Sequence, residues 1–205
     1  MTEYEPTVFL VDDDAAMLKS LSLLIKSVGL EAEAYLSAQD FLDSYDPARP
    51  GCLVLDVRMP GMSGLELQDM LLKQGITIPV IIITGHADVP VAVQTLKKGA
   101  MDFLEKPFSD QVLLERIRDA VSQDAEIRKE RTVQEAVQQR IAMLTPRERE
   151  VMNFVVAGKL NKVIASELGL SQKTVEFHRA RVMKKMMVDS VAELVMLVTK
   201  AGYNP

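Results

Sequence analysis

The sequence TVFLVDDD at residues 7–14 decides the fold, because a short apolar run suited to a buried strand passes directly into three carboxylates. Helical spacing follows over Ala15–Val28, which Gly29 closes, and over Ala38–Ser44, for which Ser37 is the expected N-cap. Further strands are predicted at 32–35, 52–55, 80–84 and 102–105. Five strands that alternate with helices are typical of an α/β domain, with a parallel sheet and helices on both faces.

Polar side chains stand where the predicted strands end: Asp12-Asp13-Asp14, Asp56, Thr84 and Lys106. In an open parallel sheet these ends share one edge, where ligands bind. The strand order 2-1-3-4-5 would place the first and third strands side by side and bring Asp12, Asp13 and Asp56 together. Three carboxylates in one crevice repel one another unless a cation joins them. A site with few protein ligands and room for water suits Mg²⁺.

The same residues suit phosphoryl chemistry. With a metal ion and Lys106 neutralising charge, one carboxylate can attack phosphorus and form an acyl phosphate. Thr84 would donate its hydroxyl to the phosphoryl oxygens. Taken singly, each residue has an ordinary explanation, because Asp-rich loops are usually solvated turns and a Lys-Pro step usually lies on the surface. Their joint placement at the ends of four strands favours a site.

Charge divides the chain unevenly. The composition, 48% hydrophobic and 26% charged, is that of a globular protein, and the net charge of −5 by itself argues against a polyanion-binding protein. However, residues 1–122 carry 19 acidic and 10 basic side chains, whereas residues 144–205 carry 6 acidic and 10 basic. Only the C-terminal part is therefore suited to nucleic acid. We expect three segments: a domain at 1–122, a helical linker at 123–143 and a second domain at 144–205.

The linker leaves two alternatives open. Residues 108–145 contain neither Gly nor Pro, and a helix that starts near Asp110 can continue past the sheet. The stretch SQDAEIRKER at 122–131 is nearly all polar, so two helices with a solvated joint are as good an interpretation as one linker helix. The chain shows no signal peptide, no apolar run of membrane-spanning length and a single cysteine, Cys52, all of which favour a reducing cytoplasm without membrane attachment.

The basic end has helix-turn-helix character. Thr145-Pro146-Arg147-Glu148 is a capping box with proline at the first helical position. Within residues 161–171, Gly169 permits a left-handed turn and Ser171 caps the next helix, Gln172–Met186. That helix is basic on much of its surface, whereas Val175, Val182 and Met186 would face a core. A basic helix is often only a solvated face, but after a capped helix and a Gly turn it favours a recognition helix in a DNA major groove.

The front domain resembles bacterial response-regulator receiver domains, through VDDD at 11–14, LDVRMPGMSG at 55–64, IIITGH at 81–86 and DFLEKPF at 102–108. The resemblance implies a flavodoxin-like fold, a phosphohistidine of a sensor histidine kinase as phosphoryl donor, and Mg²⁺. It also implies that Asp56 is the phosphoacceptor and that Thr84 and Lys106 assist. The metal would bind Asp13, Asp56 and the backbone carbonyl of Arg58 directly, and Asp12 through water. Phe103 would be the aromatic switch that moves with Thr84, although an ordinary core phenylalanine is an equally good interpretation.

The back domain resembles the LuxR-type helix-turn-helix, through LTPRERE at 144–150, NKVIASELGLSQKTVEFHRARVMKKM at 161–186 and AELV at 192–195. The combination is similar to the NarL/FixJ group and closest in pattern to FixJ. Leu160 departs from the usual polar residue, so Asn161 is expected to cap its helix instead. Glu176 replaces a common Lys, which suggests either an acceptor for cytosine or an internal salt bridge with Lys173. The expected DNA contacts are Lys173, Thr174, Glu176, Phe177, His178, Arg181, Lys184 and Lys185.

These features predict a phosphorylation-switched transcription regulator, expected to be an activator. Phosphorylation would reorganise the face at about 89–121, favour a homodimer and promote binding to double-stranded promoter DNA, with RNA polymerase as a further candidate partner. The last helix, 190–201, either dimerises or packs inside its own domain. A Mg²⁺-dependent phosphohydrolase is disfavoured, because His86 is the only second acid–base candidate. A constitutive DNA-binding protein is disfavoured by the intact set of strand-end residues.

Overall fold

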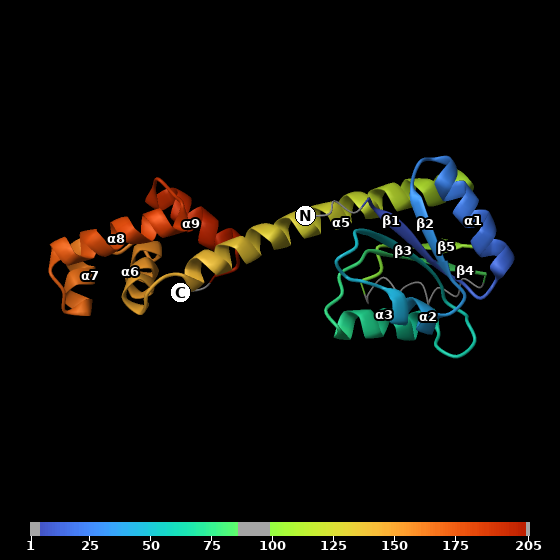
Figure 1. Cartoon of the computed structure of the whole chain (residues 1–205), viewed down its shortest axis with the longest axis horizontal. Helices are drawn as coiled ribbons and strands as arrows, with labels where there is room; N and C mark the ends of the chain where they lie inside the picture. The colour runs from blue at the N-terminus through green and yellow to red at the C-terminus, as the bar shows by residue number, and fades with distance from the viewer. Residues whose placement is uncertain (1–4, 86–98, 204–205) are drawn as a thin grey trace. The chain divides into compact units, whose positions relative to one another are not determined.

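The computed structural model describes residues 5–85 and 99–203, and these form two compact units, Met1–Ile127 and Arg128–Pro205. The first unit is built on a sheet and the second is helical (Figure 1). No helix in the described part of the chain is both long enough and apolar enough to cross a membrane.

The first unit contains one five-stranded parallel sheet in the order β2-β1-β3-β4-β5, which confirms the predicted order. Its strands are β1 (Thr7–Val11), β2 (Glu31–Tyr35), β3 (Gly51–Asp56), β4 (Val80–Thr84) and β5 (Asp102–Glu105). Val11 pairs with Leu55, so Asp12 and Asp56 come level with each other at the carboxyl edge of neighbouring strands. Thr84, the last residue of β4, pairs with Glu105, the last residue of β5. Lys106, which follows Glu105, therefore lies at the same carboxyl edge.

Helices cover both faces of the sheet (Figure 1). One face packs against α1 (Ala15–Ser27) and the first half of α5 (Asp110–Ala142). The other face packs against α2 (Ala38–Ser44) and α3 (Gly64–Lys73). Because side chains of a strand alternate between faces, β1 sends Val8 and Leu10 to one core and Phe9 to the other. A sheet buried on both faces explains why its strands read as continuous apolar runs.

Helix α5 is a single continuous helix of 33 residues, which decides between the two alternatives for the linker. Its first half buries Leu113 and Ile117 against the sheet, and its last turns place Val137 and Ile141 in the core of the second unit. The segment boundaries expected at 122 and 144 stay predictions, because α5 runs through the first of them and ends just before the second.

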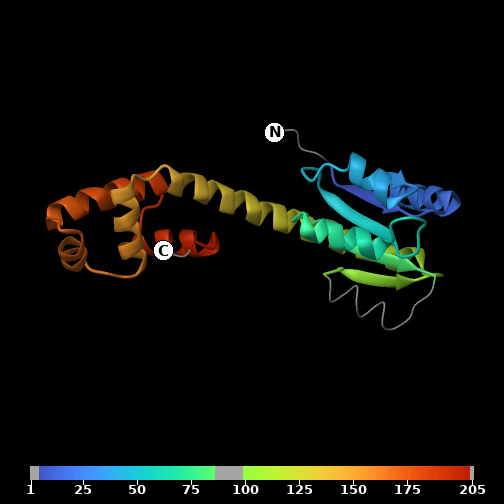
Figure 2. The same ribbon diagram turned by 90° about the horizontal axis from the view of Figure 1, so that it is seen from below.

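The second unit consists of the end of α5 and four helices, α6 (Pro146–Val156), α7 (Asn161–Leu168), α8 (Gln172–Met186) and α9 (Val191–Lys200) (Figure 2). The predicted capping box is present, with the Thr145 hydroxyl accepting from the Glu148 N–H. Gly169 adopts the left-handed conformation at φ 64°, as the turn requires, and Ser171 caps α8. Leu194 and Val198 of α9 are buried in the core of their own unit.

The expectation that Asn161 caps α7 is wrong. Leu160 occupies the N-cap position and supplies no side-chain hydrogen bond. The Asn161 side-chain oxygen instead accepts a 2.6 Å hydrogen bond from Arg179 of α8. A hydrogen bond from a charged donor is roughly twice as strong as a neutral one, so a partner from the neighbouring helix outcompetes the local cap.

Replacement of Ile141 by Ala tests whether the end of α5 belongs to the second unit. Ile141 is buried in that core, so the cavity should lower the opening free energy of α6 and α8 by about 2–5 kcal/mol. Native-state hydrogen exchange of the full chain measures this value. Val133→Ala, on an exposed part of α5, is the control and should change it by less than about 0.5 kcal/mol. Equal protection in the Ile141 variant and the wild type would contradict the assignment.

Candidate functional site

An ammonium group joins two buried carboxylates at the carboxyl edge of the sheet. The Lys106 Nζ lies 2.7 Å from Asp12 Oδ2 and 2.8 Å from Asp56 Oδ1. Asp12 and Asp56 are only 2% and 6% exposed, so each would be costly to bury without a cation. The sequence placed these three residues at one edge, and the structure brings them into direct contact.

The remaining oxygens of the two carboxylates are held by backbone N–H groups. Asp12 Oδ1 accepts from Asp14 at 2.8 Å, and Asp56 Oδ2 accepts from Arg58 at 2.6 Å. Burial would lower the pKa of Lys106, but the hydrogen bonds from its ammonium to Asp12 and Asp56 outweigh burial and raise that pKa. Lys106 therefore stays charged at neutral pH.

The three consecutive carboxylates of residues 12–14 have three different roles. Asp12 binds Lys106, and Asp14 caps α1 by accepting from the N–H groups of Ala16 and Met17. Asp13 is exposed and has no hydrogen bond or ion pair with any residue that the structure describes. Of the three, Asp13 has the carboxylate available to a ligand from outside.

The donor set fits a magnesium ion held by few protein ligands. No group of three or more acidic, histidine or cysteine side chains within residues 5–85 and 99–203 could enclose a metal ion by itself. Asp13 follows β1 and Asp56 ends the adjacent strand β3, so two carboxylates are present at this edge of the sheet. Mg²⁺ commonly binds one or two carboxylates and completes its shell with water and phosphate oxygens.

The two predicted switch residues lie on neighbouring strands. Thr84 ends β4 and is buried, whereas Phe103 in β5 is partly buried against the core that α2 and α3 cover. His86 and the part of the predicted switch face at 89–98 lie outside the described residues.

Gly64 is a site residue that the sequence reasoning did not single out. A Cβ atom at this position would lie 2.1 Å from the backbone oxygen of Asp56, a distance that real atoms do not reach. The Gly64 N–H also donates to the carbonyl of Val57 at 3.0 Å. The start of α3 can therefore approach the Asp56 loop only because residue 64 is glycine, and the signal was the glycine that follows the Ser63 cap.

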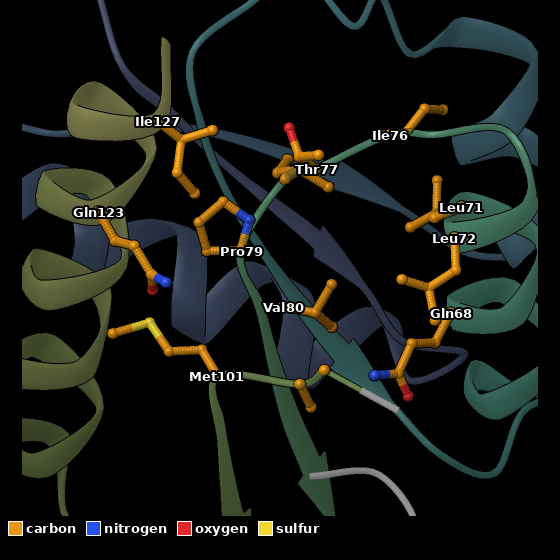
Figure 3. A pocket seen from close by; sticks show the side chains of 13 residues that line it. Gln68, Leu71, Leu72, Ile76, Thr77, Pro79, Val80, Met101, Gln123 and Ile127 are labelled. Atoms are coloured by element: carbon orange, nitrogen blue, oxygen red, sulfur yellow. The ribbon is translucent and has the colours of Figure 1, made fainter. Parts of the chain in front are cut away.

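A pocket of about 370 Å³ lies at the opposite, amino edge of the same sheet (Figure 3). Side chains from α3, the start of β4 and α5 line it, among them Leu71, Pro79 and Ile127. None of the strand-end residues around Asp56 lines it, so this pocket is separate from the acidic site.

The exposed side chains of α8 form one stripe along the helix, at the spacing of helical turns. The members of this α8 stripe are Gln172, Lys173, Glu176, Phe177, Ala180, Arg181 and Lys184. Five of them were expected to contact DNA, whereas Gln172 and Ala180 were missed, although each stands four residues from Glu176. The other expected contacts, Thr174, His178 and Lys185, are only partly exposed. Glu176 forms no ion pair with Lys173 or any other described residue, so the internal salt bridge is not found.

Lys185 has an internal partner. Its Nζ lies 2.6 Å from Glu148 Oε2, and it also donates to the Met143 carbonyl at 3.1 Å. Burial of Glu148 would raise the pKa of its carboxyl, but hydrogen bonds from Lys185 and Thr145 outweigh burial and lower this pKa from 4.5 to about 2. Glu148 therefore serves both the α6 cap and the α8 ion pair.

Comparison with known proteins covers both units. Residues 8–118 match the family described as response regulator receiver domain, and residues 142–198 match bacterial regulatory proteins of the luxR family. The transcriptional regulatory protein FixJ of Bradyrhizobium diazoefficiens is 45% identical over 195 residues, 95% of each chain. The response regulator StyR has a solved structure with a TM-score of 0.85, 45% identity and coverage of 96% and 99%. Full-length FixJ from B. japonicum gives a TM-score of 0.58 at 43% identity, with coverage of 98% and 100%.

Glu148→Gln tests the buried ion pair. A carboxyl whose pKa is lowered on folding stabilises the folded state above pH 4.5, and this contribution is lost as the pH falls toward about 2. We expect the variant to lose that pH dependence and roughly 1.5–3 kcal/mol at pH 6, measured as α6 and α8 amide protection in the full chain. Glu150→Gln is the matched control, because its pair with Arg147 is exposed and contributes about 1 kcal/mol or less. An unchanged pH profile in Glu148→Gln would contradict the ion-pair role.

Proposed function

The chain belongs to the FixJ-type response regulators, in which a receiver domain precedes a LuxR-type DNA-binding domain, and from this premise we propose that phosphorylation of Asp56 controls its binding to promoter DNA. It is a transcription regulator of two-component systems and not a turnover enzyme. The observation that carries the proposal is the Lys106 ammonium between Asp12 and Asp56, which prepares one carboxylate for an anionic phosphoryl group.

The proposed step transfers a phosphoryl group from a phosphohistidine of a sensor histidine kinase. A carboxylate oxygen of Asp56 attacks phosphorus, the N–P bond breaks, and the imidazole leaves with a proton from solvent. The Arg58 N–H holds one Asp56 oxygen, so the carboxylate is already oriented for attack. Lys106 supplies a fixed positive charge beside the new acyl phosphate, and the Thr84 hydroxyl would donate to a phosphoryl oxygen.

Magnesium is the proposed cofactor. Asp13, Asp56 and the backbone carbonyl of Arg58 would hold it directly, and Asp12 through a water molecule. When bound, the ion neutralises charge on the phosphoryl oxygens. The Asp13 carboxylate is exposed and has no ion pair or hydrogen bond within residues 5–85 and 99–203, which supports this role.

The proposed output is a homodimer on DNA. Phosphorylation would move Thr84 and Phe103, change the face that includes β5 and the start of α5, and favour pairing of two receivers. A dimer binds two half-sites at once, so its affinity for promoter DNA exceeds that of either domain alone. The same mechanism places the protein in the cytoplasm with its DNA, where RNA polymerase is a further proposed partner and the expected effect is activation.

Phosphorylation can be tested with acetyl phosphate as the donor. Incubation of the full chain with acetyl phosphate and Mg²⁺ should add one phosphoryl group, which peptide mass spectrometry should place on Asp56. Asp56→Asn should remain unmodified, and chelation of Mg²⁺ should abolish the reaction. Beryllofluoride with Mg²⁺ should shift the wild type toward a dimer in sedimentation. Equal modification of the Asp56→Asn variant would refute the phosphoacceptor.

Adjacent lysines of α8 provide a matched test of the DNA surface. Lys184 belongs to the exposed α8 stripe, whereas Lys185 is paired with Glu148. Lys184→Ala should weaken binding to all sequences alike. The slope of the logarithm of the binding constant against the logarithm of the salt concentration should become less steep by about 0.9, the value for one phosphate contact. Lys185→Ala should mainly lower the stability of the second unit. If the salt dependence of binding changes only in the Lys185 variant, Lys185 and not Lys184 contacts the phosphates, and the proposed orientation of α8 on DNA is wrong.

A further inference from the structure

Phe177 is an apolar side chain in the middle of a polar, basic surface. It belongs to the α8 stripe and is 56% exposed. Glu176 precedes it in the sequence, and Arg181 stands one helical turn further along the stripe. Single exposed apolar side chains are common in folded proteins. What sets Phe177 apart is that charged and aromatic neighbours hold its ring in a defined orientation.

Two contacts define that orientation. The Arg181 guanidinium carbon lies over the Phe177 ring at 5.0 Å from its centre, within the range of a cation–π interaction. The His178 ring meets Phe177 edge-on, with the ring centres 5.8 Å apart. Few rotamers of Phe177 keep both contacts, so less side-chain entropy remains to be lost on binding.

Arg181 is itself restrained from the interior. Its Nε lies 4.0 Å from Glu148 Oε1, a buried oxygen with no hydrogen-bond partner in the described part of the chain. The guanidinium is thus attracted by a buried carboxylate on one side and by the Phe177 ring on the other. Its exposed side remains available to a ligand.

We infer that Phe177 determines DNA sequence specificity by contacting the 5-methyl group of a thymine in the major groove. This inference deepens the proposed DNA binding and rests on it. An uncharged ring has no favourable electrostatic interaction with phosphates. The thymine methyl is the apolar group that a base pair presents in the major groove, so it is the group that the ring would contact. The basic residues that flank the ring, Lys173 and Lys184, match the negative charge of DNA.

The same geometry assigns a neighbouring base to Arg181. Residues 177 and 181 are four apart, so their side chains leave α8 about one turn, or roughly 6 Å along the helix axis, from each other. Base pairs in DNA stack about 3.4 Å apart. Arg181 therefore reaches a base within one or two steps of the thymine, and its guanidinium suits the O6 and N7 acceptors of guanine.

Uracil substitution tests the thymine contact without altering hydrogen bonding, because uracil lacks only the methyl group. The probe is a duplex selected from a random library by the full-length wild-type chain with beryllofluoride and Mg²⁺. Each thymine is replaced in turn by uracil, and dissociation constants are measured by fluorescence anisotropy. At one thymine we expect a roughly fourfold loss of affinity, the effect of exposing one methyl-sized group.

The variants decide whether Phe177 makes the contact. Phe177→Ala should bind thymine and uracil duplexes equally at that position, and Phe177→Leu, which keeps an apolar side chain, should retain part of the difference. Lys184→Ala is the control and should bind more weakly while keeping the full fourfold ratio. Circular dichroism checks that the variants fold, which the exposure of Phe177 favours.

Three outcomes would overturn the inference, and they differ from a failure of the proposed function. A uracil effect that persists in Phe177→Ala would assign the methyl contact to another residue. No uracil effect at any position would show that no thymine methyl is read. Full DNA specificity in Phe177→Ala, with loss only of transcription activation, would place the ring on a protein partner. If the wild type selects no sequence at all, the proposed DNA-binding function itself fails.

Discussion

The contact of one ammonium with two carboxylates organises the first unit. Asp12 and Asp56 end adjacent strands and are almost fully buried, so without Lys106 their charges would repel one another. Lys106 can contact both carboxylates only because β5 ends at the same edge as β1 and β3. The order of the strands and the chemistry of the site are therefore consequences of one arrangement, and the cluster of one ammonium and two carboxylates keeps one negative charge that a bound cation would balance.

The second unit also contains a buried carboxylate, Glu148, that a lysine neutralises. This carboxylate is buried because it closes the capping box of α6, and Lys185 of α8 neutralises it. The basic side chains of α8 consequently divide into two groups. Lys185 and Arg179 hold helices together, whereas Lys173, Arg181 and Lys184 stay on the exposed stripe. A count of positive charges along the helix overstates the surface that DNA can meet.

The sequence predicted the elements well where the signals are local. Strands such as Val80–Thr84 and the helix Gln172–Met186 follow from apolar spacing, and the start of that helix follows from its N-cap, Ser171. The prediction for Asn161 failed because its partner, Arg179, comes 18 residues later on another helix. The requirement for Gly64 was missed for a similar reason, since the clash that excludes a side chain involves the backbone of Asp56 on a different element.

The sequence by itself determined the two kinds of domain, the carboxyl-edge residues and the basic recognition helix. The reason is that apolar spacing, capping residues and charge are local properties of the sequence. Only the tertiary structure decided how each charge is used: Asp14 caps α1, Asp13 is exposed without an ion pair to any described residue, and Lys185 is the counterion to Glu148. It also decided that α5 is one helix whose last turns complete the second core. The physical reason is that burial and pairing depend on neighbours distant in sequence, and side chains compete for those neighbours only after the chain has folded.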